Sequence, residues 1–235
     1  MSVSADQRYA HDMSDPLEDS DARKLLLTAG VVFRAGQAGK ILDEASPLLA
    51  AEGIDLRGPA PVDVDAFRAA VVDAVERINL ERFTPVGVTR AHALSLIGVA
   101  VLAMCVADTE ALNELVMSVE PEPADDSRAS VCHVIGVCLG RLDTWHTDPR
   151  LAAAVAGTRT SSASAGLSNA TRDILAFASA GGRAFRSIDT LLLRHGSLTL
   201  LLAALFAVAA SLAAWSAHDG TGMDELVRGV MTDQI

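Results

Sequence analysis

Apolar residues recur at intervals of three and four along most of this chain, which is the spacing of one face of an α-helix. Within DVDAFRAAVVDAVERINLERF, charged residues fill the intervals between Phe67, Val71, Val75 and Ile78. Pro85 follows and does not allow the helix to continue. The pattern predicts an amphipathic helix with one buried face. Upstream, Ser46 followed by Pro47 predicts a helix start, because proline is favoured at the first helical position.

Beyond Thr89 the same spacing predicts four successive helical hairpins. Their paired segments are Arg90–Ala107 with Thr109–Val119, Arg128–Thr144 with Pro149–Ala156, Ala170–Ala180 with Arg183–His195, and Leu198–Ala217 with Gly222–Thr232. A short match between Ile97-Gly98-Val99 and Ile135-Gly136-Val137 is compatible with an internal repeat. Such matches arise easily by chance in a chain of this composition, so an irregular bundle is favoured over a true repeat.

Composition supports a helical fold. Half of the 235 residues are hydrophobic but only 4% are aromatic, so the apolar content is mostly Ala, Leu and Val. We therefore expect an all-α protein, either an irregular bundle or a short array of antiparallel helical hairpins around an Ala/Leu/Val core. Residues 1–20 lack apolar periodicity and are predicted to be a disordered acidic tail. Residues 21–235 are predicted to form one helical domain, with any division into two lobes near the Ser/Gly-rich stretch 157–169.

The most apolar stretch is SLTLLLAALFAVAASLAAWSA, residues 197–217. Its bulky residues form one stripe and its alanines another, which suits either a buried core helix or a membrane span. A capping box, Thr221 with Asp224, then starts a helix with one apolar face. If 197–217 crossed a membrane, that second helix would be left without a surface to pack on. The buried core helix is therefore favoured, and a single span at 197–217 is the alternative.

The formal net charge of −11 is unevenly distributed, with seven acids and no base in residues 108–126. This segment is either a solvated edge or an acidic docking surface for a basic partner. With two lysines and scattered arginines, the chain lacks the basic patch that nucleic-acid binding requires. No apolar stretch near the N-terminus resembles a signal peptide, and the three cysteines lie in apolar surroundings. A cytoplasmic location with reduced cysteines is therefore expected.

Candidate chemistry is confined to DTWHTDP, which holds Asp143, Trp145, His146 and Asp148. Asp143 and His146, at i and i+3, could form a base with an orienting carboxylate. The structural interpretation instead places His146 at a helix C-terminus and Trp145 in a gap between helices. No nucleophile motif accompanies them, so these four residues are a candidate binding or polar site without an assigned catalytic residue.

Metal binding is not expected. Cys132, His133 and Cys138 do not have the ligand spacing of a zinc site, and on one straight helix their side chains point in different directions. No glycine-rich phosphate loop is present. We therefore expect neither a metal nor a cofactor.

Three functional hypotheses follow. The leading one is a soluble cytoplasmic helical module for protein–protein interaction or regulation, without catalytic chemistry. The second is a protein anchored in a membrane by a single span at 197–217, and the third is a small-molecule enzyme using Asp143 and His146. A protein partner of unidentified kind is expected and nucleic acid is not. Membrane association is not favoured, and the oligomeric state is left open.

Overall fold

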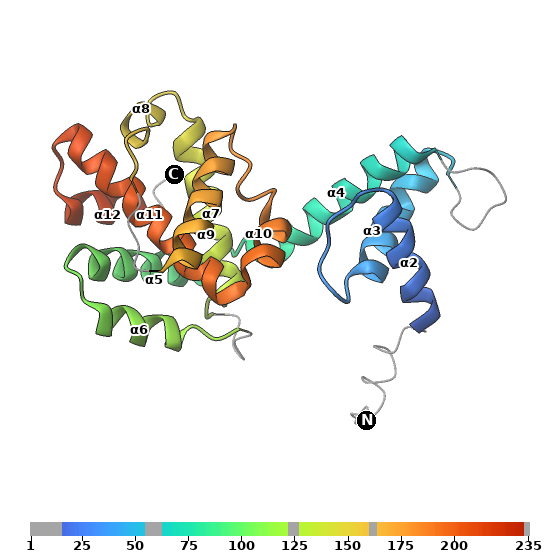
Figure 1. Cartoon of the computed structure of the whole chain (residues 1–235), viewed down its shortest axis with the longest axis horizontal. Helices are drawn as coiled ribbons and strands as arrows, with labels where there is room; N and C mark the ends of the chain where they lie inside the picture. Colours follow the sequence, from blue (N-terminus) through green and yellow to red (C-terminus); the bar gives the residue numbers. More distant parts are fainter. Residues whose placement is uncertain (1–15, 55–62, 122–126, 160–163, 233–235) are drawn as a thin grey trace. The chain divides into compact units, whose positions relative to one another are not determined.

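A computed structural model describes residues 16–54, 63–121, 127–159 and 164–232. All regular secondary structure within these ranges is helical, in eleven α-helices (Figure 1). The predicted all-α class, with a bundle or array of helices, is confirmed. Of the segment predicted to be a disordered tail, residues 1–15 lie outside the described residues, and a helix already begins at Pro16.

The chain divides into two compact units, Met1–Asn79 and Leu80–Ile235. The predicted lobe boundary, 157–169, falls inside the second unit, and residues 160–163 of that stretch lie outside the described residues. Whether 21–235 behaves as one domain in solution stays a prediction.

The first unit contains α2 (Pro16–Thr28), α3 (Ala38–Ala51) and most of α4 (Val64–Phe83). The predicted face of α4 is confirmed, with three of its four residues buried and Val75 half-buried. The predicted helix start at Pro47 is wrong, because Pro47 lies inside α3. Ile41, Ala45 and Leu49 are buried at intervals of four on both sides of the proline, so packing of one continuous face favours one continuous helix.

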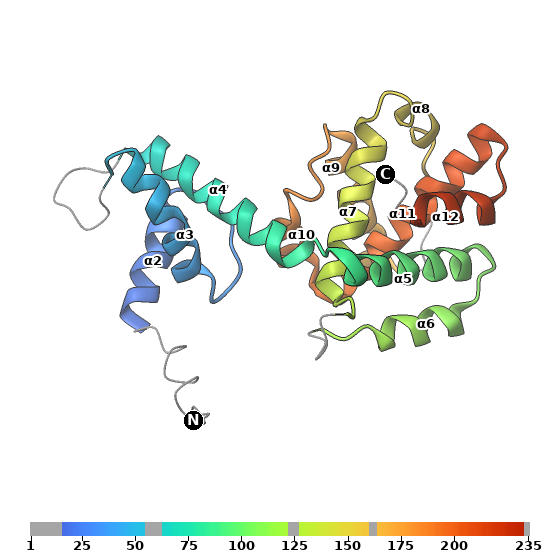
Figure 2. The same ribbon diagram turned by 180° about the vertical axis from the view of Figure 1, so that it is seen from behind.

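The second unit contains the end of α4 and eight further helices, whose order follows the four predicted hairpins (Figure 2). They are α5 (Gly87–Cys105) with α6 (Thr109–Ser118), α7 (Val131–Thr147) with α8 (Ala152–Val155), α9 (Ala165–Ser179) with α10 (Ile188–His195), and α11 (Ser197–Asp219) with α12 (Met223–Met231). The described boundaries differ from the predicted ones by a few residues at most ends. Helices α8 and α10 are much shorter than their predicted segments, because α8 has four residues and α10 begins only at Ile188.

Helix α11 lies at the centre of the second unit and packs against α5, α7, α8, α9, α10 and α12. Both of its predicted stripes contribute to the core, since Leu201, Leu205 and Leu212 are buried and so are Ala203 and Ala207. Helix α12 packs on α11 and α5 and buries Leu226 and Val227. The hairpin therefore closes on itself, and the small and the bulky face of α11 each have neighbouring helices.

By length and composition, α5 and α11 are two helices among the described residues that could cross a membrane. Within the most apolar window, 56% of the α11 residues and 39% of the α5 residues are buried inside the fold. A core helix of a soluble protein passes the same test of length and composition. The fold therefore covers a smaller share of α5 than of α11, although α11 also has exposed residues such as Leu198.

Helix α7 approaches the end of α4 very closely at one residue. A Cβ atom added to Gly136 would overlap the backbone carbonyl of Phe83. Gly140, one turn further along α7, has open space where its side chain would be. Glycine at position 136 therefore sets how closely α7 and this part of α4 can pack.

Candidate functional site

Asp143 joins α7 to the turn that leads into α10. Its two carboxylate oxygens accept hydrogen bonds from the backbone N–H groups of Ala184 and Phe185, at 2.8 and 2.9 Å. Burial raises the pKa of Asp143, while these two hydrogen bonds and the nearby His146 act in the opposite direction. The carboxylate is therefore used to hold a loop that is 41 residues away in the sequence.

Trp145 and Asp148 also have structural contacts. The Trp145 ring is buried and lies edge-to-face with Trp215 of α11, with ring centroids 6.1 Å apart and an interplanar angle of 71°. The Asp148 carboxylate accepts a hydrogen bond from the backbone N–H of Arg150 at 2.8 Å, within the turn that precedes α8. The Trp145 contact agrees with the expected position of this ring between helices.

His146 contacts Ser179, a residue that lies in no sequence motif. Its Nδ1 atom lies 3.3 Å from Ser179 Oγ at the end of α9, whereas its buried Nε2 atom has no hydrogen-bond partner among the described residues. Asp143 acts on His146 electrostatically, but no hydrogen bond joins them. In a serine–histidine–aspartate triad the ring bonds to the nucleophile through one nitrogen and to the carboxylate through the other. Here the second of these bonds is missing.

No sequence signal pointed to Ser179, because it is 33 residues from His146 and lies in no recognisable motif. The contact depends on α7 and α9 packing side by side. The structure thus brings Asp143 and His146 into one region with Ser179, and it directs Trp145 and Asp148 toward other neighbours.

Asp143→Ala is expected to destabilise the second unit by about 1–3 kcal/mol, because two partly buried backbone N–H groups lose their acceptor. Both tryptophans, Trp145 and Trp215, belong to this unit, so tryptophan fluorescence during urea unfolding reports on it selectively. Thr144→Ala, a change at an exposed neighbour on the same helix, is the control and is expected to change stability by less than about 0.5 kcal/mol. Equal stability of the two variants would contradict the structural role of Asp143.

A pH dependence follows from His146 and His133, because burial lowers the pKa of both imidazoles from the ordinary value of 6.5. Below about pH 6.5 the unfolded chain then binds more protons than the native protein. The stabilising contribution is fully present above that pH, and it is lost as the pH falls toward the lowered pKa values that the two histidines have in the native protein. We expect the urea midpoint to fall between pH 7.5 and pH 6, and to fall less steeply in His146→Gln. Identical slopes for the two proteins would contradict a contribution from His146.

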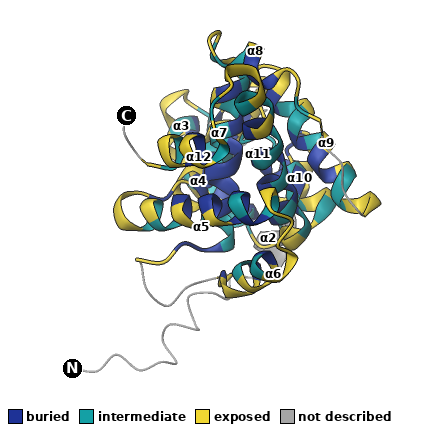
Figure 3. Cartoon of the chain, turned by 90° about the vertical axis from the view of Figure 1, so that its left-hand side faces the viewer, coloured by how far each residue is buried: buried dark blue, intermediate teal, exposed yellow. Residues whose placement is uncertain are grey.

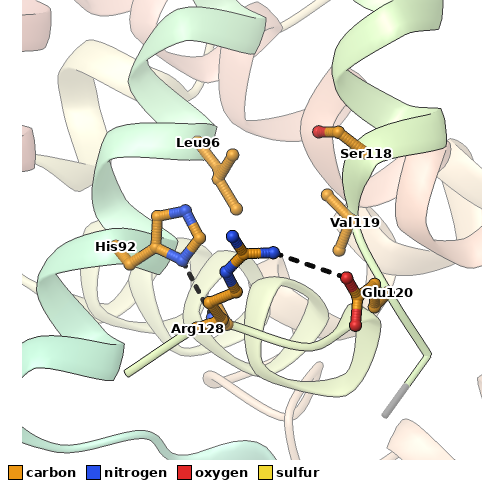
Figure 4. Close-up of a pocket in the computed structure, with 7 residues that line it drawn as sticks. His92, Leu96, Ser118, Val119, Glu120 and Arg128 are labelled. Carbon is orange, nitrogen blue, oxygen red and sulfur yellow. Dashed lines mark hydrogen bonds and ion pairs between the residues drawn. The ribbon is translucent and has the colours of Figure 1, made fainter. Parts of the chain in front are cut away.

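A small pocket of about 250 Å³ lies where α5, the end of α6 and the start of α7 meet (Figure 4). His92 Nδ1 accepts a hydrogen bond from the backbone N–H of Ala129 at 2.9 Å, which leaves Nε2 of a neutral ring as the donor. Arg128 and Glu120 form an ion pair at 3.5 Å on the pocket wall. The other lining residues are Leu96, Ser118 and Val119. The volume is below that of most drug-sized ligand sites, and both charges already have partners.

Helix α5 carries a strip of mainly apolar residues that the described second unit leaves exposed. Figure 3 shows exposed residues along α5, and those of this strip recur every three or four positions. We call them the α5 stripe, which consists of Val88, Ala91, Ser95, Val99 and Leu102 on α5 and Val106 at its C-cap, with Ser95 as its one polar member. Val88 is 69%, Val99 51% and Val106 74% exposed, whereas Leu102 is half-buried. From Ala91 to Val106 the sequence contains no Asp, Glu, Lys or Arg.

The cysteines do not form a reactive or metal-binding group. Cys105, Cys132 and Cys138 are free thiols, and burial raises the pKa of Cys105 and Cys138. Within the described ranges, no cluster of three or more His, Cys, Asp or Glu side chains could hold a metal ion. The residues that the structure describes therefore offer no preformed site for a metal.

Comparison with known proteins finds no matching family model, no similar curated protein and no similar solved structure. The function has to be argued from the sites themselves, because an all-α fold alone does not imply an activity.

Proposed function

We propose that this protein is a non-catalytic helical module that binds another protein, in a regulatory or assembly role, in the cytoplasm. The observation that carries the proposal is the α5 stripe, an exposed apolar strip on a protein whose central apolar helix α11 is already enclosed. Contiguous exposed apolar surface on a soluble protein is typical of an interaction site.

The geometry around Asp143 supports this class over an enzyme. Both oxygens of the carboxylate are used by backbone N–H groups, and the His146 ring lacks the second hydrogen bond of a catalytic triad. The enzyme using Asp143 and His146 and the single span at 197–217 both stay alternatives.

The test is purification of the tagged full-length protein from its own cells, followed by measurement of mass and stoichiometry by light scattering. A companion protein at a fixed ratio is expected. The same cells are fractionated, and the protein is expected in the soluble fraction. A protein that resists carbonate extraction from membranes would favour the alternative of a membrane anchor. A protein recovered alone and soluble would contradict the proposal.

A further inference from the structure

We infer that the α5 stripe binds a partner helix that is apolar on one face and basic along the edges of that face. This inference rests on the proposed function and adds to it the surface and the chemistry of the partner.

The shape of the stripe suits a helix. Val88 and Val106 are 18 positions apart, which corresponds to about 27 Å along an α-helix. Rows of side chains spaced three and four apart form the ridges and grooves by which two helices pack. A partner helix of about five turns would cover the whole stripe.

Two helices border the stripe on opposite sides. At Gly98, an added Cβ would contact Val227 and Met231 of α12, at 3.6 Å each. His92 and Leu96 line the pocket together with Ser118 and Val119 at the end of α6. Because each helical residue advances about 100° around the axis, Gly98 and Leu96 lie on opposite flanks of the stripe. The stripe is thus the floor between α6 and α12.

The exposed charges on these two bordering helices are mainly acidic. The acidic residues are Asp108, Glu110 and Glu114 at α6, and Asp224 and Glu225 at α12. Among the described residues, none of these five carboxylates forms an ion pair with a basic side chain. Burial raises the pKa of Cys105 at the C-terminal end of α5, and the nearby Asp224 carboxylate raises it further. One exposed base, Arg228, lies on α12. The two bordering helices thus carry more carboxylates than bases, and this net negative charge beside the apolar floor is complementary to an apolar helix face with Lys or Arg at its edges.

The same charges disfavour two other occupants. A second copy of the chain would bring its own acidic borders against these, and juxtaposed like charges cost several kcal/mol. An anionic membrane surface attracts basic segments and would repel this face. The complementary protein helix is the occupant that satisfies both the apolar floor and the borders.

The test uses the full-length protein and a labelled helical peptide of about 18 residues, with Leu at helical spacing on one face and Lys along both edges. Binding is measured by fluorescence anisotropy at low and moderate salt. We expect saturable binding that weakens with salt, because charge attraction is screened. A peptide in which every Lys is replaced by Glu is expected to bind at least about tenfold more weakly, which is about 1.4 kcal/mol.

Two uncharged substitutions identify the surface. Val99→Gln removes an apolar contact from the middle of the stripe, and Val72→Gln on α4 is the matched control, since both valines are 51% exposed. We expect Val99→Gln to weaken peptide binding at least about tenfold and Val72→Gln to leave it unchanged. Circular dichroism of both variants checks that they fold. The double variant Glu110→Gln with Glu114→Gln is expected to reduce the salt dependence.

Each remaining outcome overturns the inference. Equal binding of the Lys and Glu peptides, or binding that Val99→Gln leaves unchanged, would show that the α5 stripe is not the predicted surface. Binding of phosphatidylcholine or phosphatidylglycerol vesicles that Val99→Gln abolishes, without a preference for the Lys peptide, would identify a lipid surface. Val99-dependent dimers in sedimentation would identify a second copy. A companion that co-purifies equally with wild type and Val99→Gln would show that the partner does not bind the α5 stripe. The proposed function as a protein-binding module would still stand.

Discussion

Replacing Gly136 with Ala is expected to destabilise the Leu80–Ile235 unit by about 3 kcal/mol or more. The new Cβ atom would occupy the position of the Phe83 carbonyl, and a backbone group cannot move aside as a flexible side chain can. Relief requires α7 to separate from the end of α4, in a core where Phe83, Ile135 and Leu139 are all completely buried. Urea unfolding followed by tryptophan fluorescence measures the loss, because both tryptophans belong to this unit.

Gly140→Ala is the matched control on the same helix. Nothing lies within 4 Å of the added methyl group, and alanine is favoured over glycine in a helix interior. This variant is expected to be as stable as the wild type or more stable by up to about 1 kcal/mol. A Gly136→Ala variant as stable as Gly140→Ala would mean that α7 and this part of α4 do not approach each other as described.

Leu205→Ala is expected to cost about 2–5 kcal/mol, because it removes a buried side chain from the central helix and leaves a cavity. Leu205 is 1% exposed, whereas Leu198 of the same helix is 58% exposed. Leu198→Ala is therefore expected to change stability by less than about 0.5 kcal/mol. The two variants are compared in the same fluorescence-monitored urea unfolding.

These two variants also distinguish between the two interpretations of α11, a buried core helix and a membrane span. In a lone span, lipid surrounds the helix on every side. The loss of stability on replacing a leucine with alanine would then depend little on which side of the helix that leucine occupies. In the enclosed helix, one leucine is in the core and the other faces water. A large difference between the variants in a soluble protein supports the enclosed helix, and similar losses would contradict it.

The candidate chemistry around DTWHTDP shows what the sequence can and cannot tell. Spacing alone predicted that Asp143 and His146 would be near each other, and the electrostatic influence of each on the other's pKa agrees with this. It could not predict that the Asp143 oxygens would accept hydrogen bonds from Ala184 and Phe185, or that His146 would face Ser179. These partners lie 33 to 42 residues away, and only the packing of α7 against α9 brings them close.

The docking surface was also only partly predictable from the sequence. The charge of the acidic segment beyond Asp108 was evident from the residues, and a basic partner was one of two interpretations. The exposed apolar stripe on α5 was not evident, because Val88, Val99 and Val106 are indistinguishable by residue type from the buried Val101 and Val116. Exposure depends on which side of α5 the neighbouring helices cover.

The sequence by itself determined the helical class, the order of the hairpins and the apolar character of α11. These properties depend on spacing within ten to twenty residues, where helical periodicity and turn residues act locally. Tertiary structure alone decided that the chain divides between Asn79 and Leu80, that α3 runs through Pro47, that Gly136 meets Phe83, and that α5 keeps one apolar face uncovered. The physical reason is that periodicity shows which residues favour burial, whereas only the packing of distant segments determines which of them are covered.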